Sequence, residues 1–151
     1  MARQNVSSGR PWEASCGFSR AVRIGNVVEV SLTTPTAPDG SILYPNDVYR
    51  QTRESLRIIE AALAEAGASL SDVIRTAMYL KDMRDWEAAG RAHGEVFGKI
   101  RPVTGWIGVS GFFTDGIVAE VSATAIIQPK SRSKRTRAGR APRRRAVRRR
   151  Q

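Results

Sequence analysis

The chain of 151 residues contains one histidine, His93, and one cysteine, Cys16. These are two of the side chain types best suited to proton transfer or nucleophilic attack. His93 repeats at helical spacing with Trp86 and Phe97, and a lone histidine on an apolar helix face is more often a packed residue than a catalytic one. It has no histidine or cysteine partner at ligand spacing, so we predict no metal site and no cofactor. A single cysteine excludes an intrachain disulfide and fits a reducing compartment, so we expect a cytoplasmic location.

Several other classes of protein are excluded by what the sequence lacks. It contains no Walker loop, no GxGxxG motif and no GxSxG motif, which are the usual signs of phosphate binding or of an activated serine. No stretch approaches the roughly 20 apolar residues that span a bilayer. The first residues, MARQNVSSGRPWEAS, lack the apolar segment of a signal peptide. We therefore expect no membrane partner.

The net charge of +11 is confined to the C-terminal segment. Residues 130–151 hold twelve basic residues and no acid, whereas residues 1–129 hold thirteen basic and fourteen acidic residues. With no periodic apolar residues, this basic tail is predicted to be disordered. Three interpretations stay open: non-specific nucleic-acid binding through the tail only, a solvated segment with no partner, or a spurious extension from GC-rich coding.

Hydrophobic periodicity predicts the elements that must position any site. The first sixteen residues, which include Gly9 and Pro11, are predicted to form an N-terminal loop, and residues 17–129 the folded domain. The expected strands are 18–24, 27–33, 73–80, 103–109 and 117–127, and the expected helices are 47–66 and 85–97. This order predicts an α+β fold in which two helices cover one face of the sheet. The opposite face then has no cover from this chain, which indicates oligomerisation.

Four segments carry a resemblance to a known family. GFSRAVRIGNVVEVSLTTP, AGASLSDVIRTAMYLKDM, RPVTGWIGVS and VAEVSATAI resemble the first hairpin, the helix with the third strand, and the closing strands of the RidA (YjgF) family, over roughly residues 17–128. The resemblance implies a chorismate-mutase-like fold with one mixed sheet, assembled as a homotrimer with small-molecule clefts between subunits. It also implies hydrolysis of reactive enamines and imines to 2-oxo acids and ammonia.

The expected catalytic residues come from this resemblance. The serine of the family's second strand is kept as Ser31, and the first glutamate of its last strand is kept as Glu120. In the family such groups surround a water that attacks the C=N carbon, and positioning with charge placement suffices for that reaction. The alternatives are a strand-end serine bonded to backbone and a strand carboxylate paired with a surface cation.

Other positions depart from the family pattern. The arginine that holds the substrate carboxylate is absent, because Thr104 stands two residues after Pro102. Phe18 replaces a tyrosine, and Leu32 replaces the glycine after the serine. The second glutamate of the last strand is replaced by Ser122. Since a charge-assisted bidentate pair is lost, binding of an imino-acid carboxylate should weaken by ~10²-fold or more.

The remaining candidates are ligand-binding residues. The aromatic residue that starts the second helix is kept as Trp86, and in the family it faces the neighbouring subunit's cleft. Trp106 and Trp86 would form an aromatic wall, unless Trp106 fills the trimer core. Thr104 and Ser122 would bind a neutral polar ligand, or else are merely satisfied strand residues. Arg84, or Arg101 before Pro102, would replace the missing anchor, or else is a solvated surface arginine.

The sequence therefore predicts an arginine-lacking member of the RidA family. The expected function is a small-metabolite site on a trimeric scaffold, with enamine or imine hydrolysis at a non-standard site. The alternative is a non-catalytic small-molecule-binding or regulatory trimer.

Overall fold

A computed structural model describes residues 2–128 of the chain. The predicted basic tail, residues 130–151, lies outside the described residues. Among residues 2–128, no helix combines the length and the apolar character that a membrane span needs.

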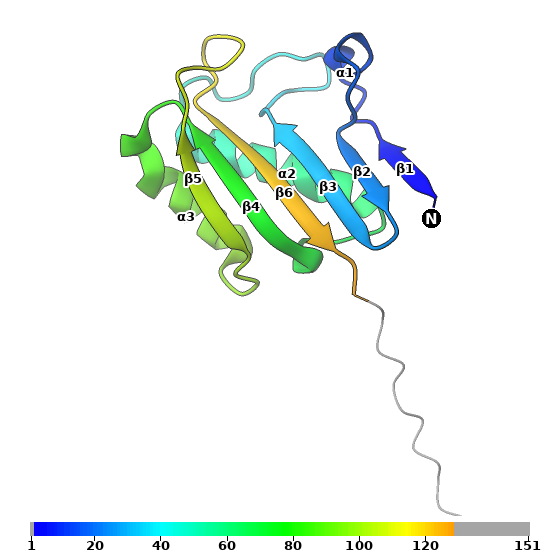
Figure 1. The fold of residues 1–151 in the computed structure, drawn as a ribbon. Coiled ribbons are helices and arrows are strands. Elements are labelled where there is room, and N and C mark those ends of the chain that lie inside the picture. The colour runs from blue at the N-terminus through cyan, green and yellow to red at the C-terminus, as the bar shows by residue number, and fades with distance from the viewer. Residues whose placement is uncertain (1, 129–151) are drawn as a thin grey trace, which may run out of the picture.

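Six strands form one mixed sheet in the order β1-β2-β3-β6-β4-β5 (Figure 1). Only the β4–β5 pair is parallel, and the other neighbours are antiparallel. The strands are β1 (Arg3–Val6), β2 (Ala21–Ile24), β3 (Val27–Thr33), β4 (Val73–Leu80), β5 (Val103–Gly108) and β6 (Ala119–Ile126). The predicted α+β fold with one mixed sheet is confirmed.

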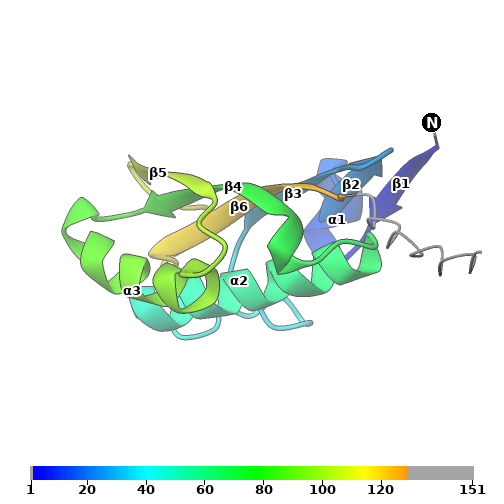
Figure 2. The same ribbon diagram turned by 90° about the horizontal axis from the view of Figure 1, so that it is seen from below.

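Two long helices cover one face of the sheet, as Figure 2 shows. They are α2 (Val48–Glu65) and α3 (Trp86–Phe97). Short 3-10 turns, η1 (Leu70–Asp72) and η2 (Met83–Asp85), precede β4 and α3 respectively. The core lies between these helices and the sheet.

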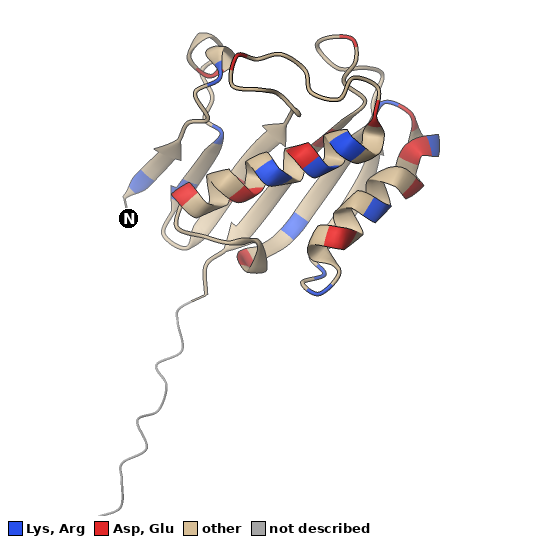
Figure 3. Ribbon diagram, turned by 180° about the vertical axis from the view of Figure 1, so that it is seen from behind, with Lys and Arg blue, Asp and Glu red and all other residues tan. Residues whose placement is uncertain are grey.

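The N-terminal cap and the apolar spacing of α2 explain where this helix begins and which side of it packs on the sheet. The Asp47 carboxylate caps the helix by accepting a 2.9 Å hydrogen bond from the Arg50 backbone N–H, which satisfies one of the orphan donors at the N-terminus. Leu56, Ile59 and Leu63 are fully buried against the sheet. The opposite side of α2 carries alternating acidic and basic residues that face solvent (Figure 3).

The other face of the sheet is not covered by any helix of this chain (Figure 2). Its exposed apolar side chains include Ile24, Val27, Val103 and Ile107, with Val103 69% exposed. This matches the uncovered face that the two-helix count predicts.

The N-terminal sixteen residues differ from the predicted loop. Arg3–Val6 form β1, which pairs antiparallel with β2, and Pro11–Cys16 form the short helix α1. The strand was missed because only Val6 of its four residues is buried, so it has no alternating pattern. The signal for α1 is Pro11 at its first turn and Gly17 with φ +70° at its end, an asymmetry typical of helix termini.

Candidate functional site

One pocket combines an apolar wall with ionisable groups and has a volume of about 370 Å³. It lies where β3 ends and the antiparallel strand β6 begins. Loops and α1 close over these strand ends: the Trp12 ring of α1 lies 5.5 Å from the ring of Phe113, and Gly40 packs against the same Trp12 ring. The lining residues are Trp12, Cys16, Phe18, Arg20, Leu32, Thr34, Thr36, Phe113 and Glu120. Two residues predicted for the site, Phe18 and Glu120, therefore line one pocket.

Glu120 is a buried carboxylic acid in the wall of this pocket. Only 5% of the residue is exposed, and its Oε1 accepts a short hydrogen bond from the Thr34 hydroxyl. Burial raises the pKa of the Glu120 carboxyl, while the bond from Thr34 and the charge of Arg20 oppose the rise. A carboxyl group with a raised pKa in a pocket can hold or release a proton closer to neutral pH.

Arg20 is the second ionisable group of the pocket, and sequence reasoning did not identify it. It is 5% exposed, and its Nη1 donates to Ser31 Oγ at 2.9 Å, Thr33 Oγ1 at 2.9 Å and the Leu32 carbonyl at 3.2 Å. In the sequence it stands between Ser19 and Ala21 of a predicted strand, and no motif there marks it as a buried cation. Burial beneath α1 and the loops gives it a different environment.

Ser31 lies beside the pocket rather than in its lining. Its backbone N–H donates to the Arg20 carbonyl at 2.9 Å, and its hydroxyl accepts from Arg20 Nη1 at 2.9 Å. The pairing of β3 with β6 shifts register between Val30 and Thr33, which turns Leu32, 40% exposed, into the pocket. Ser31 thus reaches the pocket through Arg20, and its catalytic role stays a prediction.

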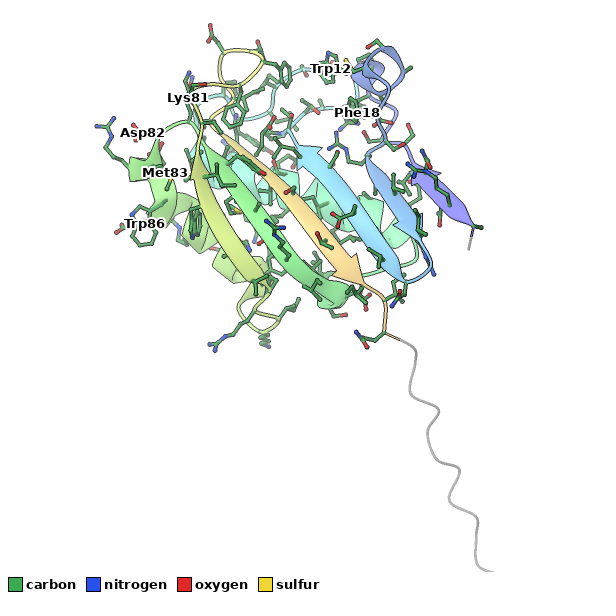
Figure 4. All side chains as sticks on the ribbon, in the orientation of Figure 1. Trp12, Phe18, Lys81, Asp82, Met83 and Trp86 are labelled. Carbon is green, nitrogen blue, oxygen red and sulfur yellow. The ribbon has the colours of Figure 1, made fainter. Side chains whose placement is uncertain are left out.

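Trp86 and Arg84, two further predicted ligand-binding residues, lie away from this pocket. Figure 4 shows Trp86 at the opposite side of the sheet from Phe18. Trp86, at the start of α3, is 51% exposed. Arg84 donates from Nε to both Asp82 carboxylate oxygens, at 3.0 and 2.9 Å, and these bonds lower the pKa of Asp82 to about 2. The Arg84 guanidinium therefore already has a carboxylate partner.

Thr104 lies on edge strand β5 and is linked to His93, the single histidine, through the hydroxyl of Thr76. Thr76 Oγ1 donates to Thr104 Oγ1 at 2.9 Å and lies 2.9 Å from His93 Nε2. Because the one Thr76 proton is used toward Thr104, His93 Nε2 carries the proton in this arrangement and donates it to Thr76. His93 is buried against Phe97, with ring centroids 4.8 Å apart, and burial lowers its pKa.

Trp106 and Ser122 occupy two further environments. Trp106 is partly buried, and its ring packs over Gly90 of α3. Ser122 lies on the uncovered sheet face, where it and Arg75, Tyr79 and Glu29 line a shallow polar depression of about 170 Å³. Neither residue reaches the pocket of Glu120 within one chain.

A larger groove of about 550 Å³ runs along the outer side of α2 and α3. Four of its charged side chains are paired, Arg53 with Glu95 at 3.1 Å and Arg57 with Glu54 at 2.6 Å, and the Arg50 guanidinium stacks on the Tyr44 ring at 3.9 Å. None of the residues predicted for the site lines this groove, so its greater volume does not make it the candidate site. Over residues 2–128, no cluster of histidine, cysteine and carboxylate side chains has the arrangement of a metal site.

Comparison with known proteins agrees with this description. The sequence model of the family described as Endoribonuclease L-PSP matches residues 9–127, which include α1. An uncharacterized protein of Streptomyces coelicolor is 42% identical over 125 residues, covering 82% of this chain and 92% of the relative. The 3-aminoacrylate deaminase RutC of Acinetobacter baylyi is 30% identical over 105 residues, covering 70% of this chain and 82% of that enzyme.

The solved structures are similar over nearly the whole described domain. The crystal structure of Rv2704 from Mycobacterium tuberculosis, a member of the YjgF/YER057c/UK114 family, has a TM-score of 0.76 and 43% identity. The similarity covers 83% of this chain and all of that chain.

Proposed function

The chain belongs to the RidA (YjgF) family, and we propose that it hydrolyses small enamines or imines in the pocket of Glu120. The observation that carries this proposal is a carboxylic acid 5% exposed, with a raised pKa, in the wall of a largely apolar pocket. The similarity to RutC, a 3-aminoacrylate deaminase, supports the same class of reaction.

The reaction divides into two proton transfers that one carboxyl group can serve in turn. Water adds to the carbon of the protonated C=N bond (an iminium) while the ionised Glu120 accepts one of its protons, which forms a neutral carbinolamine. The protonated Glu120 then returns the proton to the nitrogen. The C–N bond breaks to release ammonia, the hydroxyl oxygen forms the carbonyl, and its proton passes to the ionised Glu120 or to water. A raised pKa makes the protonated form of Glu120 more populated at a given pH than that of an exposed glutamate.

Thr34 positions the acid for these steps. Its hydroxyl donates to Glu120 Oε1, so the second oxygen of the carboxyl group is left for water. The walls from Trp12, Phe18 and Phe113 are aromatic, which limits the number of waters that compete with the reacting one.

We also propose that the working unit is a homotrimer in which a neighbour completes each pocket. In one chain the pocket of Phe18 and Glu120 lies at the ends of β3 and β6 in the middle of the sheet, whereas Thr104 and Trp106 lie on edge strand β5, and Trp86 lies on the β5 side, away from Phe18 (Figure 4). Burial of the uncovered sheet faces against one another would bring the edge strand β5 of one subunit beside the pocket of the next. Three such clefts would then bind three small-molecule ligands.

The test is hydrolysis of imines generated freshly from several amino acids by an amino-acid oxidase. We expect the full chain to release 2-oxo acid faster than the uncatalysed reaction, with the gain reduced ~10²-fold or more in Glu120→Gln. Glu60→Gln is the matched control, because Glu60 is an exposed carboxylate on the outer side of α2. No acceleration from a folded trimer on any imine would refute the hydrolase proposal.

The second candidate is a trimer that binds small molecules without turnover. It is favoured by Leu32, which is 40% exposed in the pocket where the family pattern has a glycine. A bulky apolar side chain there adds contact area for a ligand and takes space from a reacting water. Saturable binding by the wild-type protein together with zero acceleration would select this candidate.

A further inference from the structure

A second cavity, of about 310 Å³, lies on the helix side of the sheet, between residues 7–10 and the C-terminal half of α2. Its apolar floor is formed by Val6 and by one face of α2, with Ile58, Ala61 and Ala62. Its polar lining includes three arginines, of which Arg57 is already paired with Glu54 at 2.6 Å. None of the residues predicted for the functional site lines this cavity.

Arg10, in the wall of this cavity, is a cation held only by neutral groups. Its Nε donates to Thr36 Oγ1 at 3.2 Å, its Nη2 to the Thr36 carbonyl at 2.6 Å and its Nη1 to the Ser8 carbonyl at 3.2 Å. Three ion pairs occur among residues 2–128, and none includes Arg10. The guanidinium is therefore fixed in direction, while its charge has no anion in contact.

Two hydrogen-bond donors of Arg10 remain unused. A guanidinium has five N–H bonds, one on Nε and two on each terminal nitrogen. The bonds to Thr36 and Ser8 take one hydrogen from each nitrogen, so one hydrogen on Nη1 and one on Nη2 have no partner among the described residues. Two such donors match the two oxygens of a carboxylate. Because three bonds already orient the group, less entropy is lost when a ligand binds.

Arg20 brings a second positive charge to the same cavity. Burial lowers the pKa of Arg20, and the charge of Arg10 lowers it further, whereas Glu13 and Glu120 act in the opposite direction. The two arginines therefore repel one another through space. An anion bound to Arg10 would relieve this repulsion without contacting Arg20 Nε, which is enclosed by the fold.

The carboxylates near the cavity do not compensate Arg10 by contact. Glu13 accepts from Ser7 Oγ at 2.6 Å and from the Ser8 backbone N–H at 2.9 Å. Asp39 accepts hydrogen bonds within its own turn. Glu65 lines the cavity, but it lies one face-repeat beyond the floor residues, toward the end of α2. One end of the cavity is thus cationic, and the other carries an acid.

We propose that this cavity binds a small aliphatic monocarboxylate. The two oxygens of the acid accept from Nη1 and Nη2 of Arg10, and its hydrocarbon chain packs on Ile58 and Ala61. The apolar floor favours such an acid over free phosphate, which has no apolar part to bury. Glu65 at the other end repels a second anionic group, so a dicarboxylate is disfavoured.

This site goes beyond the proposed function and does not depend on it. Among the described residues, Arg20 is the one member shared by the linings of this cavity and of the pocket of Glu120. The catalytic carboxyl group and the aromatic walls of that pocket face a different space. Imine hydrolysis and binding of the aliphatic acid are therefore separate measurements, and either can fail alone.

The test compares an acid with its neutral amide in the full-length protein. Hexanoate and hexanamide have the same hydrocarbon chain and differ in charge. By calorimetric titration we expect hexanoate to bind about 10- to 100-fold more tightly, as for hydrogen bonds to a charged group. Arg10→Gln should remove this preference. Arg53→Gln is the matched control, because Arg53 is exposed on α2 outside the cavity and should keep the preference.

A cavity-filling pair covers the case in which Arg10→Gln does not fold. Ala61→Phe places a ring over the floor and should weaken hexanoate binding at least 10-fold, whereas Ala64→Phe, exposed on the same helix outside the lining, should not. Leu32→Trp narrows the pocket of Glu120 and should leave hexanoate binding unchanged. Equal affinity of the wild type for acid and amide would overturn the proposal. So would binding that is lost in Leu32→Trp and kept in Ala61→Phe.

Discussion

The Arg20 guanidinium and the Ser31 hydroxyl are joined by a 2.9 Å hydrogen bond, while the Ser31 backbone N–H returns a 2.9 Å bond to the Arg20 carbonyl. This reciprocal pair couples the end of β3 to the residue that precedes β2. Any change at Ser31 is therefore transmitted to the charged wall of the pocket. The first prediction follows from this coupling.

Replacing Ser31 by alanine should destabilise the fold modestly. The lost bond has a charged donor, but Arg20 keeps Leu32 and Thr33 as acceptors, so we expect about 1–2 kcal/mol. Urea unfolding measures the loss. Ser31→Thr keeps the hydroxyl and should stay near wild type, and an equal loss in both variants would show that the hydrogen bond is not the cause.

Glu120 should make the protein less stable as the pH rises. Its pKa in the fold lies above the ordinary value of 4.5, so its contribution is fully present below pH 4.5 and is lost as the pH rises through the folded pKa. Unfolding of wild type and Glu120→Gln at a series of pH values should show this loss only in the wild type. Parallel curves would contradict the raised pKa.

Thr34 should shift the pKa of Glu120 without taking part in the proton transfers itself. Its hydrogen bond lowers the pKa of Glu120, so Thr34→Val should raise that pKa further and move the Glu120-dependent limb of the pH–rate profile to higher pH. Thr34→Ser keeps the donor and should leave the limb in place. A shift of the limb to lower pH in Thr34→Val would contradict the assignment.

His93 should give the opposite pH dependence of stability. Burial lowers its pKa below 6.5, so its contribution is present above pH 6.5 and is lost as the pH falls through the folded pKa. The measurement is unfolding of the wild type and of His93→Gln between pH about 5 and about 8. Stability of the variant should fall less on acidification, and an identical fall would exclude His93 as the source.

The uncovered sheet face should hold the subunits together. Ile107 is 39% exposed on this face, paired in register with Tyr79. Ile107→Glu would bury a charge in the interface and should shift the protein from trimer to monomer in sedimentation velocity. Ala64→Glu is the control, since Ala64 is exposed on α2. A trimer that survives Ile107→Glu would place the interface elsewhere.

The long elements could be predicted because their signals are local. The expected helices at 47–66 and 85–97 correspond to Val48–Glu65 and Trp86–Phe97, and the strand at 73–80 is the same in the structure. Apolar spacing and caps act within a few residues, so they can be read along the chain. The strand Arg3–Val6 could not, because its stability comes from pairing with β2 rather than from its own polar sequence.

The sequence by itself determined the family, the order of the main elements and the presence of Glu120 at the expected strand position. Only the tertiary structure decided that Phe18 and Glu120 line one pocket while Trp86 and Thr104 lie away from it, on the side of edge strand β5. It also decided the surroundings of Arg20, because its burial and its hydrogen-bond partners depend on how distant segments pack around it. Side-chain type is a property of the chain, whereas desolvation and pairing are properties of the fold.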